Sequence, residues 1–237
     1  MSSEMQVAIG WSASPDAMRA GKEATGMASD RLGAHRAQLA LVFASSWFDQ
    51  QQLLEGVHLV SGDIPLMGGS TAGEITPEGP TSHSCLVVLI SAEGLEWRLG
   101  IGEGVNRAPR EAGRQAAASA SRDVRASPRI GFLAFGDGLA PNHTDTMRGI
   151  QEILGTGSLV AGGMAGDDLR FTRTYQYFNR RIVSDAVVGV VFGGLGKIGV
   201  GIQHGFAPIG KPRHITRAHA NVLMELDGHP AASVYEE

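Results

Sequence analysis

Two glycine-rich stretches constrain the fold more than any other feature of this sequence. The first covers residues 66–75 and reads Leu-Met-Gly-Gly-Ser-Thr-Ala-Gly-Glu-Ile. The second covers residues 159–168 and reads Leu-Val-Ala-Gly-Gly-Met-Ala-Gly-Asp-Asp. Because glycine adopts positive φ and allows close backbone approach at little steric cost, each stretch is expected to form a tight turn.

The two stretches predict an internal duplication. Laid over each other without gaps, they align Gly69 with Gly162 and Glu74 with Asp167, so an acid follows the last glycine in both. Residues 99–104 also resemble residues 200–205, which places His204 opposite Glu103. A period of 93 to 101 residues follows, with repeats at about 36–122 and 128–226. Chance similarity between glycine-rich strands is the alternative.

Composition excludes several classes of protein. The net charge of −4 argues against a nucleic-acid partner, because phosphate binding needs clustered Lys and Arg. The sequence has no apolar run of the roughly 18 residues that a membrane span needs, and its first residues do not resemble a signal peptide. Cys85 is the single cysteine and is expected to be buried. Without a disulfide framework, a reducing cytoplasm is the expected compartment.

Apolar patterning predicts an α+β fold with mixed, largely antiparallel sheets covered by helices. Each half is expected to run strand, helix, strand, strand, strand, helix. Strands are predicted at residues 6–11, 39–44, 85–90, 96–101, 130–135, 174–178, 186–192 and 197–203. Helices are predicted at residues 14–33, 46–54, 109–122, 142–154 and 216–226, where Gly56 is interpreted as the end of the second helix.

No hydrolase signature stands out in the sequence. Residues 68–75 carry the two glycines of the phosphate-binding loop, but Glu74 stands where lysine is required. Ser70 is not in a G-x-S-x-G elbow, and neither H-E-x-x-H nor C-x-x-C occurs. No enzymatic activity is therefore expected, although a hydrolase that uses Ser70 or Thr71 stays open as an alternative.

Several motifs together resemble the N-terminal domain of the FIST family, named for F-box and intracellular signal transduction proteins. They are residues 68–75, 161–167, 185–190, 204–210 and 225–231. The resemblance covers nearly the whole chain and implies one domain over residues 1–237, with the start of a C-terminal half at 227–237.

The resemblance implies a cytoplasmic sensory module that binds a small molecule, such as an amino acid or related metabolite. Its implied partners are bacterial signalling proteins with kinase, diguanylate cyclase or chemoreceptor modules. No cofactor is expected; the alternatives are a haem-binding nitric oxide sensor, with His204 as the axial ligand, and a protein-interaction scaffold without a ligand.

The ligand site is expected where the two glycine stretches approach each other. Hydroxyl groups and backbone N–H groups would meet ligand oxygens, and the acids would accept an ammonium group or another donor. The predicted site residues are Gly69, Ser70, Thr71, Glu74, Gly163, Asp167, Asp168 and His204. In the alternative interpretation, Glu74 and Asp167 each cap a nearby backbone N–H and meet no ligand.

Overall fold

The computed structural model describes residues 5–122, 129–194, 197–219 and 221–236. The chain divides into two compact units, Met1–Ile198 and Gly199–Glu237, which are described separately below. Residues 1, 128 and 237, which bound three of the expected segments, lie outside the described residues.

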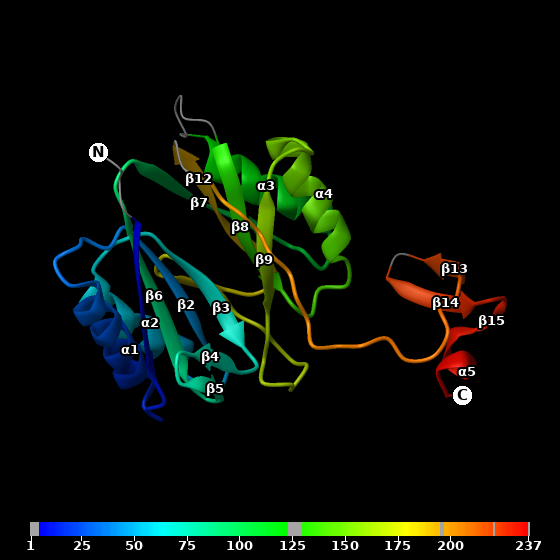
Figure 1. Ribbon diagram of the computed structural model, residues 1–237, viewed down its shortest axis with the longest axis horizontal. Helices are drawn as coiled ribbons and strands as arrows, with labels where there is room; N and C mark the ends of the chain where they lie inside the picture. Colours follow the sequence, from blue (N-terminus) through cyan, green and yellow to red (C-terminus); the bar gives the residue numbers. More distant parts are fainter. Residues whose placement is uncertain (1–4, 123–128, 195–196, 220, 237) are drawn as a thin grey trace. The chain divides into compact units, whose positions relative to one another are not determined.

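The first unit contains two copies of one arrangement of helices and strands (Figure 1). The first copy consists of β1 (Met5–Ser12), α1 (Ala17–Leu32), β2 (Leu39–Ser45), α2 (Gln50–Ser61), β3 (Leu66–Thr71), the hairpin β4 (Glu74–Thr76) and β5 (Gly79–Thr81), and β6 (Cys85–Ala92). The second consists of β7 (Leu95–Glu103), α3 (Pro109–Ser121), β8 (Arg129–Asp137), α4 (His143–Leu154), β9 (Val160–Ala165), the hairpin β10 (Gln176–Phe178) and β11 (Arg181–Val183), and β12 (Ala186–Gly194).

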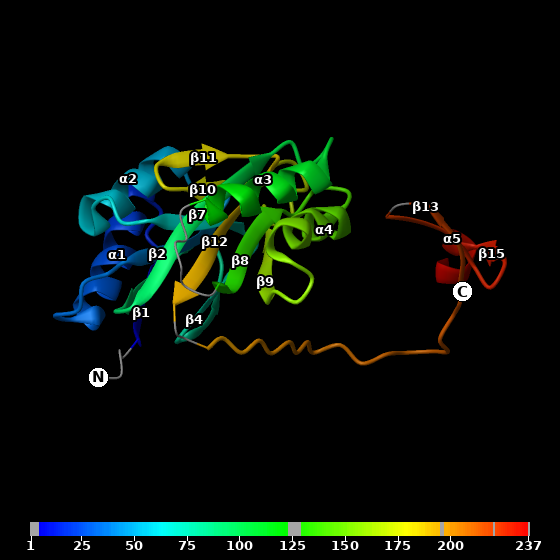
Figure 2. The ribbon, with the colours of Figure 1, turned by 90° about the horizontal axis from the view of Figure 1, so that it is seen from above.

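Four layers form in the order helices, sheet, sheet, helices (Figure 2). The first sheet has the order β1-β6-β2-β3-β10-β11 and the second β7-β12-β8-β9. The pairs β2/β3 and β8/β9 are parallel and the other pairs are antiparallel, which confirms the α+β class with largely antiparallel sheets. Helices α1 and α2 cover the first sheet, α3 and α4 cover the second, and a third apolar cluster fills the space between the sheets.

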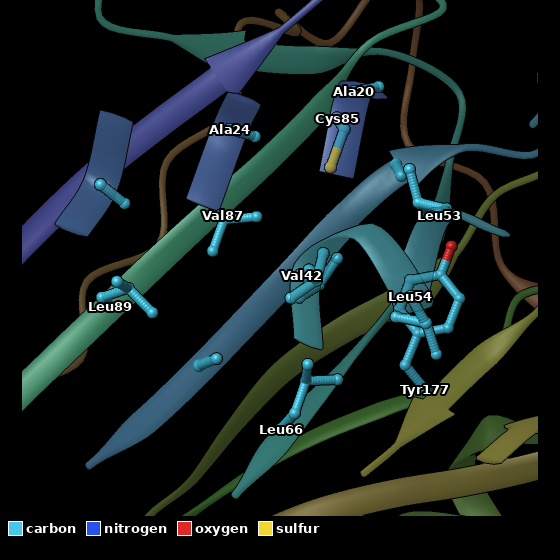
Figure 3. Packing of buried hydrophobic residues seen from close by; sticks show 14 of the residues in the cluster. Ala20, Ala24, Val42, Leu53, Leu54, Leu66, Cys85, Val87, Leu89 and Tyr177 are labelled. Carbon is cyan, nitrogen blue, oxygen red and sulfur yellow. The ribbon is translucent and has the colours of Figure 1, made fainter. Parts of the chain in front are cut away.

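The core beneath α1 and α2 is made mostly of small side chains (Figure 3). Ala20, Ala24 and Cys85 are fully buried, and burial raises the pKa of the Cys85 thiol, as expected for an inert core cysteine. Tyr177 enters this core from the second copy, and its hydroxyl donates a hydrogen bond to Gln50. The second copy therefore completes the core of the first.

Each helix pair is in contact through two glycines. A Cβ atom on Gly21 of α1 would lie 2.3 Å from the Leu53 carbonyl oxygen of α2, and one on Gly56 would lie 2.1 Å from the Met18 oxygen. Gly113 and Gly149 make the same approach between α3 and α4. The expectation that Gly56 ends its helix is wrong, because this glycine lies inside α2 at the contact with α1.

The glycine stretches are strands rather than turns, and their true alignment differs by one residue. Gly68 pairs with Val42 in β2, and Gly162 pairs with Ala134 in β8. Both glycines have φ of 153°, and a Cβ on either would lie 1.8 Å from the partner's carbonyl oxygen. Gly68 therefore corresponds to Gly162, one residue away from the predicted alignment of Gly69 with Gly162.

The duplicated unit also begins earlier than expected, at β1 and β7, because its copies span residues 5–92 and 95–194. The strand predicted at residues 197–203 is wrong, since these residues form no regular structure. The strand and helix expected at the end of the first repeat, residues 96–101 and 109–122, are β7 and α3. These two elements open the second copy, as β1 and α1 open the first.

The second unit contains β13 (Ile215–His219), β14 (Val222–Leu226), β15 (His229–Pro230) and the short helix α5 (Ala231–Glu236). The helix predicted at residues 216–226 is wrong. Asp227 and Gly228 have φ of 50° and 81° and form the two-residue turn between β14 and β15, with Leu226 paired to His229. An Asp-Gly pair with positive φ at both positions favours a hairpin, and this signal outweighs the apparent helical periodicity.

Candidate functional site

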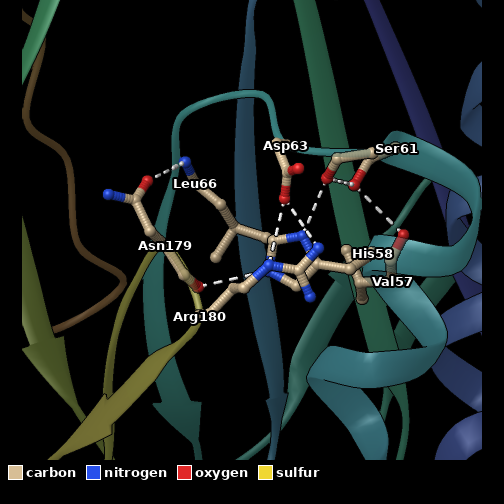
Figure 4. Close-up of polar contacts among 8 residues, drawn as sticks. Val57, His58, Ser61, Asp63, Leu66, Asn179 and Arg180 are labelled. Carbon is tan, nitrogen blue, oxygen red and sulfur yellow. Dashed lines mark hydrogen bonds and ion pairs between the residues drawn. The ribbon is translucent and has the colours of Figure 1, made fainter.

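The hairpin β10–β11 joins the two copies, because β10 pairs antiparallel with β3. Its turn is held at Asn179, whose side chain accepts a hydrogen bond from the Leu66 N–H at 3.2 Å (Figure 4). His58 lies between two carbonyl oxygens, with Nδ1 2.8 Å from Gly62 and Nε2 3.3 Å from Asn179. Ten residues, 166–175, connect β9 to this hairpin and form the loop at the candidate site.

Ser70 and Thr71 lie where β3 ends beside this loop. The Ser70 hydroxyl donates to the Gly166 carbonyl at 2.6 Å and accepts from the Tyr175 N–H at 2.8 Å, and its residue is 1% exposed. Backbone bonds of 2.8 Å from Gly166 to Ser70 and 3.1 Å from Asp168 to Thr71 continue the contact. The structure thus brings the two predicted stretches together and gives the Ser70 hydroxyl protein partners.

Glu74 is buried beside the hairpin β4–β5. Its carboxylate accepts hydrogen bonds from the Thr71 hydroxyl and from both the N–H and the hydroxyl of Ser84. The residue is 3% exposed. This arrangement matches the alternative interpretation, in which Glu74 organises its own turn.

Asp167 organises the loop that follows β9. Its carboxylate accepts from the backbone N–H groups of Phe171, Thr172 and Arg173 at 3.0, 2.6 and 3.1 Å. Burial acts to raise the pKa of Asp167, but the N–H groups of Thr172, Phe171 and Arg173 outweigh it and hold this pKa below its usual value. Asp167 is therefore a structural cap, as in the alternative interpretation.

Asp168 reaches across to the end of β2. Its Oδ2 atom accepts from the Ser45 hydroxyl at 2.9 Å, from the Ser46 N–H at 2.8 Å and from the Ser46 hydroxyl at 2.6 Å. Ser45 and Ser46 are buried. One carboxylate oxygen of Asp168 is thus committed to anchoring the loop on β2.

The segment that follows is strained and exposed. Asp168, Leu169 and Phe171 have φ of 55°, 61° and 53°, a conformation that costs side-chain-bearing residues free energy. Leu169 and Phe171 are 73% and 74% exposed. Hydrogen bonds to Asp167 and Asp168 hold this segment in place with its apolar side chains in solvent.

Arg170 completes a polar corner at the ends of β2 and β3. Its guanidinium lies 5.1 Å from the ring centroid of Trp47 and donates to the Ser46 hydroxyl at 3.1 Å. Trp47 is 62% exposed, and its other neighbour is the His83 ring at 5.5 Å. We call the set of Ser45, Ser46, Trp47, Asp168 and Arg170 the loop corner.

Sequence reasoning found only Asp168 among these five residues. A signal did exist, because Ser45, Ser46 and Trp47 directly follow a predicted apolar strand. Ligands in sheets with parallel strands bind outside the carboxyl ends of those strands, and β2 and β3 are such a pair. The contact itself could not be predicted, because Ser45 and Asp168 are 123 residues apart in the chain.

Gly69 and Gly163 are not part of the loop corner, and His204 belongs to the second unit. Gly69 and Gly163 lie within β3 and β9, where they pair with Phe43 and Phe135 of the neighbouring strands. His204 lies in an exposed stretch of the second unit, where its ring is 5.9 Å from that of Phe206. A haem iron needs an axial ligand inside an apolar pocket, and exposed His204 does not fit that requirement.

Among the described residues, three of the open grooves lie elsewhere on the first unit. One of about 670 Å³ is lined by residues that include Arg36, Ser61 and Asp63, and another of about 450 Å³ shares Asp63 and extends to Arg180. The third, of about 410 Å³, lies beside α3. None of the three is lined by a predicted site residue.

Within the described residues, no group of three or more His, Cys, Asp or Glu side chains is arranged to hold a metal ion. None of the helices in the described part of the chain is long and apolar enough to span a membrane.

Comparisons with known proteins give one extensive match. A family model described as the FIST N domain matches residues 38–229. An uncharacterized protein of Methanocaldococcus jannaschii is 26% identical over 210 residues, which is 83% of this chain and 40% of that protein. The chain thus spans about two fifths of the length of this curated relative.

Solved structures are similar at a low level. A structure titled "Cyanuric acid hydrolase: evolutionary innovation by structural concatenation" has a TM-score of 0.41 and 9% identity, and covers 82% of this chain and 71% of its own. A second cyanuric acid hydrolase, from A. caulinodans, has a TM-score of 0.40 and 8% identity, and covers 79% and 71%.

Proposed function

Because the chain belongs to the FIST N domain family, we propose that it is a cytoplasmic sensory module that binds a small polar metabolite, such as an amino acid, at the loop corner. The family is associated with signal transduction and with sensing of small ligands. In this proposal the bound state is passed on to bacterial kinase, diguanylate cyclase or chemoreceptor modules.

The observation that carries the proposal is the strained segment 168–171. Three residues with positive φ cost about 1–3 kcal/mol each, and such strain is concentrated at functional sites. The segment is held by the hydrogen bonds that Asp167 accepts from its own loop and by those that Asp168 accepts from Ser45 and Ser46. A preorganised loop of this kind reduces the conformational entropy that is lost when a ligand binds.

The side chains of the loop corner favour a ligand that carries both a negatively charged and a positively charged group. The Arg170 guanidinium suits a carboxylate, because its planar N–H groups match carboxylate geometry. The contacts of Asp168 with Ser45 and Ser46 use Oδ2, and in this proposal Oδ1 accepts a hydrogen bond from an ammonium group of the ligand. The exposed face of Trp47 suits the ligand's aliphatic or aromatic side chain.

The same loop suits signal transmission. Residues 166–175 end at β10, and β10 forms the contact between the two copies. A ligand that shifts the loop would therefore act on the hairpin β10–β11 and on the junction it forms with β3. We propose this hairpin as the element whose position reports occupancy.

The proposal includes no catalytic step. A nucleophilic serine needs a free hydroxyl beside a base, whereas the Ser70 hydroxyl is buried and bonded to backbone groups on both sides. Thr71 donates to Glu74, which holds the turn of its own hairpin. These contacts support a binding role over hydrolysis.

Replacing Arg170 with alanine is expected to weaken binding of the preferred amino acid about tenfold to a hundredfold, because a charge-assisted hydrogen bond contributes about 1.5–3 kcal/mol. Isothermal titration calorimetry against the standard amino acids measures the change. Arg173→Ala is the matched control, since Arg173 lies over the Tyr175 ring in the same loop. Equal affinity of wild type and Arg170→Ala, or equal losses in both variants, would contradict binding at the loop corner.

A further inference from the structure

The outer edge of β9 is open. In the sheet order β7-β12-β8-β9, β9 pairs with β8 on one side and with none of the described strands on the other. Gly162, Gly163 and Met164 are exposed along this edge, and Met164 is 48% exposed. An unpaired strand presents backbone donors and acceptors to any further strand.

The other sheet edges carry features that discourage pairing, and β9 does not. Charged side chains occur along β7, at Glu96 and Arg98, and in β11, at Arg181. On β1, the Ile9 carbonyl accepts a hydrogen bond from the Arg31 guanidinium at 2.7 Å. The β9 sequence Val-Ala-Gly-Gly-Met-Ala contains neither a charge nor a proline. Natural proteins usually protect exposed edges with such residues, so an unprotected edge indicates one that is covered in use.

The corresponding strand of the first copy shows how such an edge is covered. On β3, strand β10 lies antiparallel with Gly68 opposite Tyr177 and Gly69 opposite Gln176. Bonds of 2.8 Å from Ser70 N to Tyr175 O and 2.7 Å from Asn179 N to Leu66 O mark the two ends of this pairing. Because Gly68 corresponds to Gly162, the equivalent outward-facing groups on β9 belong to Val160, Gly162 and Met164.

The chain's own first hairpin cannot reach this edge in the same way. Only Ala72 and Gly73 separate β3 from β4, and two extended residues span about 7 Å. The ten-residue loop before β10 allows that hairpin to cross to the other copy. With so short a connection, β4 stays on its own copy, where Glu74 is bonded to Ser84.

Gly163 supplies an independent observation. A Cβ on Gly69, its counterpart, would lie 2.9 Å from the carbonyl oxygen of Tyr175, the residue directly before the docked strand β10, so docking of that strand favours glycine there. A Cβ on Gly163 would meet only the Phe135 ring, at 3.9 Å. Contacts within the described residues therefore do not require glycine at 163, whereas a hairpin docked as on β3 would.

We propose that the edge of β9 accepts one strand of a β-hairpin from a further domain of this fold, in the antiparallel register that β10 uses on β3. The relative from Methanocaldococcus jannaschii, of which this chain spans 40%, has room for such a domain.

Gln151 of α4 occupies the position that His58 occupies in α2. The N–H of the capping glycine Gly155 bonds to the carbonyl of Gln151, as the N–H of Gly62 bonds to the carbonyl of His58. The Gln151 amide suits the turn carbonyl that His58 contacts on Asn179.

A cyclised peptide of residues 174–185, which contains β10 and β11, provides the probe. The peptide should bind the whole chain and slow amide hydrogen exchange at Gly162 and Met164. Gly163→Ala should weaken this binding about tenfold or more at an unchanged melting temperature. Gly157→Ala, at a position with open space around the new methyl group, is the matched control and should bind like wild type. Absence of binding, protection elsewhere than β9, or unchanged affinity in Gly163→Ala would each overturn the proposal.

Discussion

Gly21→Ala should destabilise the chain by about 3 kcal/mol or more, because the new methyl group has no space between α1 and α2. Its Cβ would lie 2.3 Å from the Leu53 carbonyl oxygen and 3.0 Å from the Val57 nitrogen, both backbone atoms that cannot rotate away. The two helices must separate, which also loosens the apolar cluster beneath them. A shift of this size lowers the melting temperature of a domain this large by roughly 10 °C.

Gly26→Ala in the same helix provides the control. A Cβ at Gly26 meets nothing within 4 Å, so only helix propensity changes there. Alanine is better than glycine in a helix by up to about 1 kcal/mol, and this variant should be slightly more stable than wild type. Thermal and urea unfolding measure both effects. If Gly21→Ala were as stable as Gly26→Ala, the close contact between α1 and α2 would be refuted.

Asp167→Asn should cost about 3 kcal/mol, because a charged acceptor of several backbone N–H groups is replaced by an amide that carries donors of its own. The loss includes the bonds to Phe171, Thr172 and Arg173. Since these hold segment 168–171 in its strained form, the loop should become mobile and ligand affinity should fall with it. Asp63→Asn is the control, because its side chain is 82% exposed in an ion pair with Arg180 and should change stability by less than about 1 kcal/mol.

The contribution of Asp167 to stability should depend on pH in a defined direction. Its pKa is lower in the folded chain than its usual value of 3.8, so the unfolded chain binds more protons at acid pH. The contribution is therefore fully present above about pH 5 and is lost as the pH falls through the folded pKa. The difference in unfolding free energy between wild type and Asp167→Asn should shrink below pH 4. A difference that stays constant down to pH 2 would show that Asp167 has the same pKa in the folded and unfolded chain, so that the loop N–H groups do not stabilise its carboxylate.

Local signals in the sequence predict much of the fold. Pro109 opens α3, Asn142 caps α4 through the Asp145 N–H, and the apolar runs at residues 39–44 and 186–192 are buried strands. Ala116, Ala117 and Ala120 recur at helical spacing and lie in the second core. Caps and periodicity act over a few residues, which is why they can be recognised without tertiary information.

The errors arise where a residue serves a distant contact. Gly56 has the appearance of a helix terminator but lies inside α2, because its role is to admit the Met18 carbonyl of α1. The glycine stretches were misaligned by one residue, since only the pairing of Gly68 with Val42 and of Gly162 with Ala134 fixes the register. A slip of one residue in a strand exchanges its two faces.

The same reason limits prediction of the site. The sequence indicated that the two stretches approach each other, and Ser70 does bond to Gly166. It did not indicate that Asp167 folds back on its own loop while Asp168 reaches Ser46, because adjacent acids have identical chemistry. Only the backbone conformation of the loop separates the two roles, and that conformation depends on contacts from both copies.

Binding at the loop corner is tested most directly by nuclear magnetic resonance titration of the isotope-labelled chain with its preferred amino acid. We expect chemical-shift changes at the Ser46 amide, the Trp47 indole N–H and the amides of residues 168–171. Smaller changes should extend along β10 as the loop adjusts. Changes confined to the groove lined by Arg36, Ser61 and Asp63, or no saturable change with any amino acid, would contradict the account.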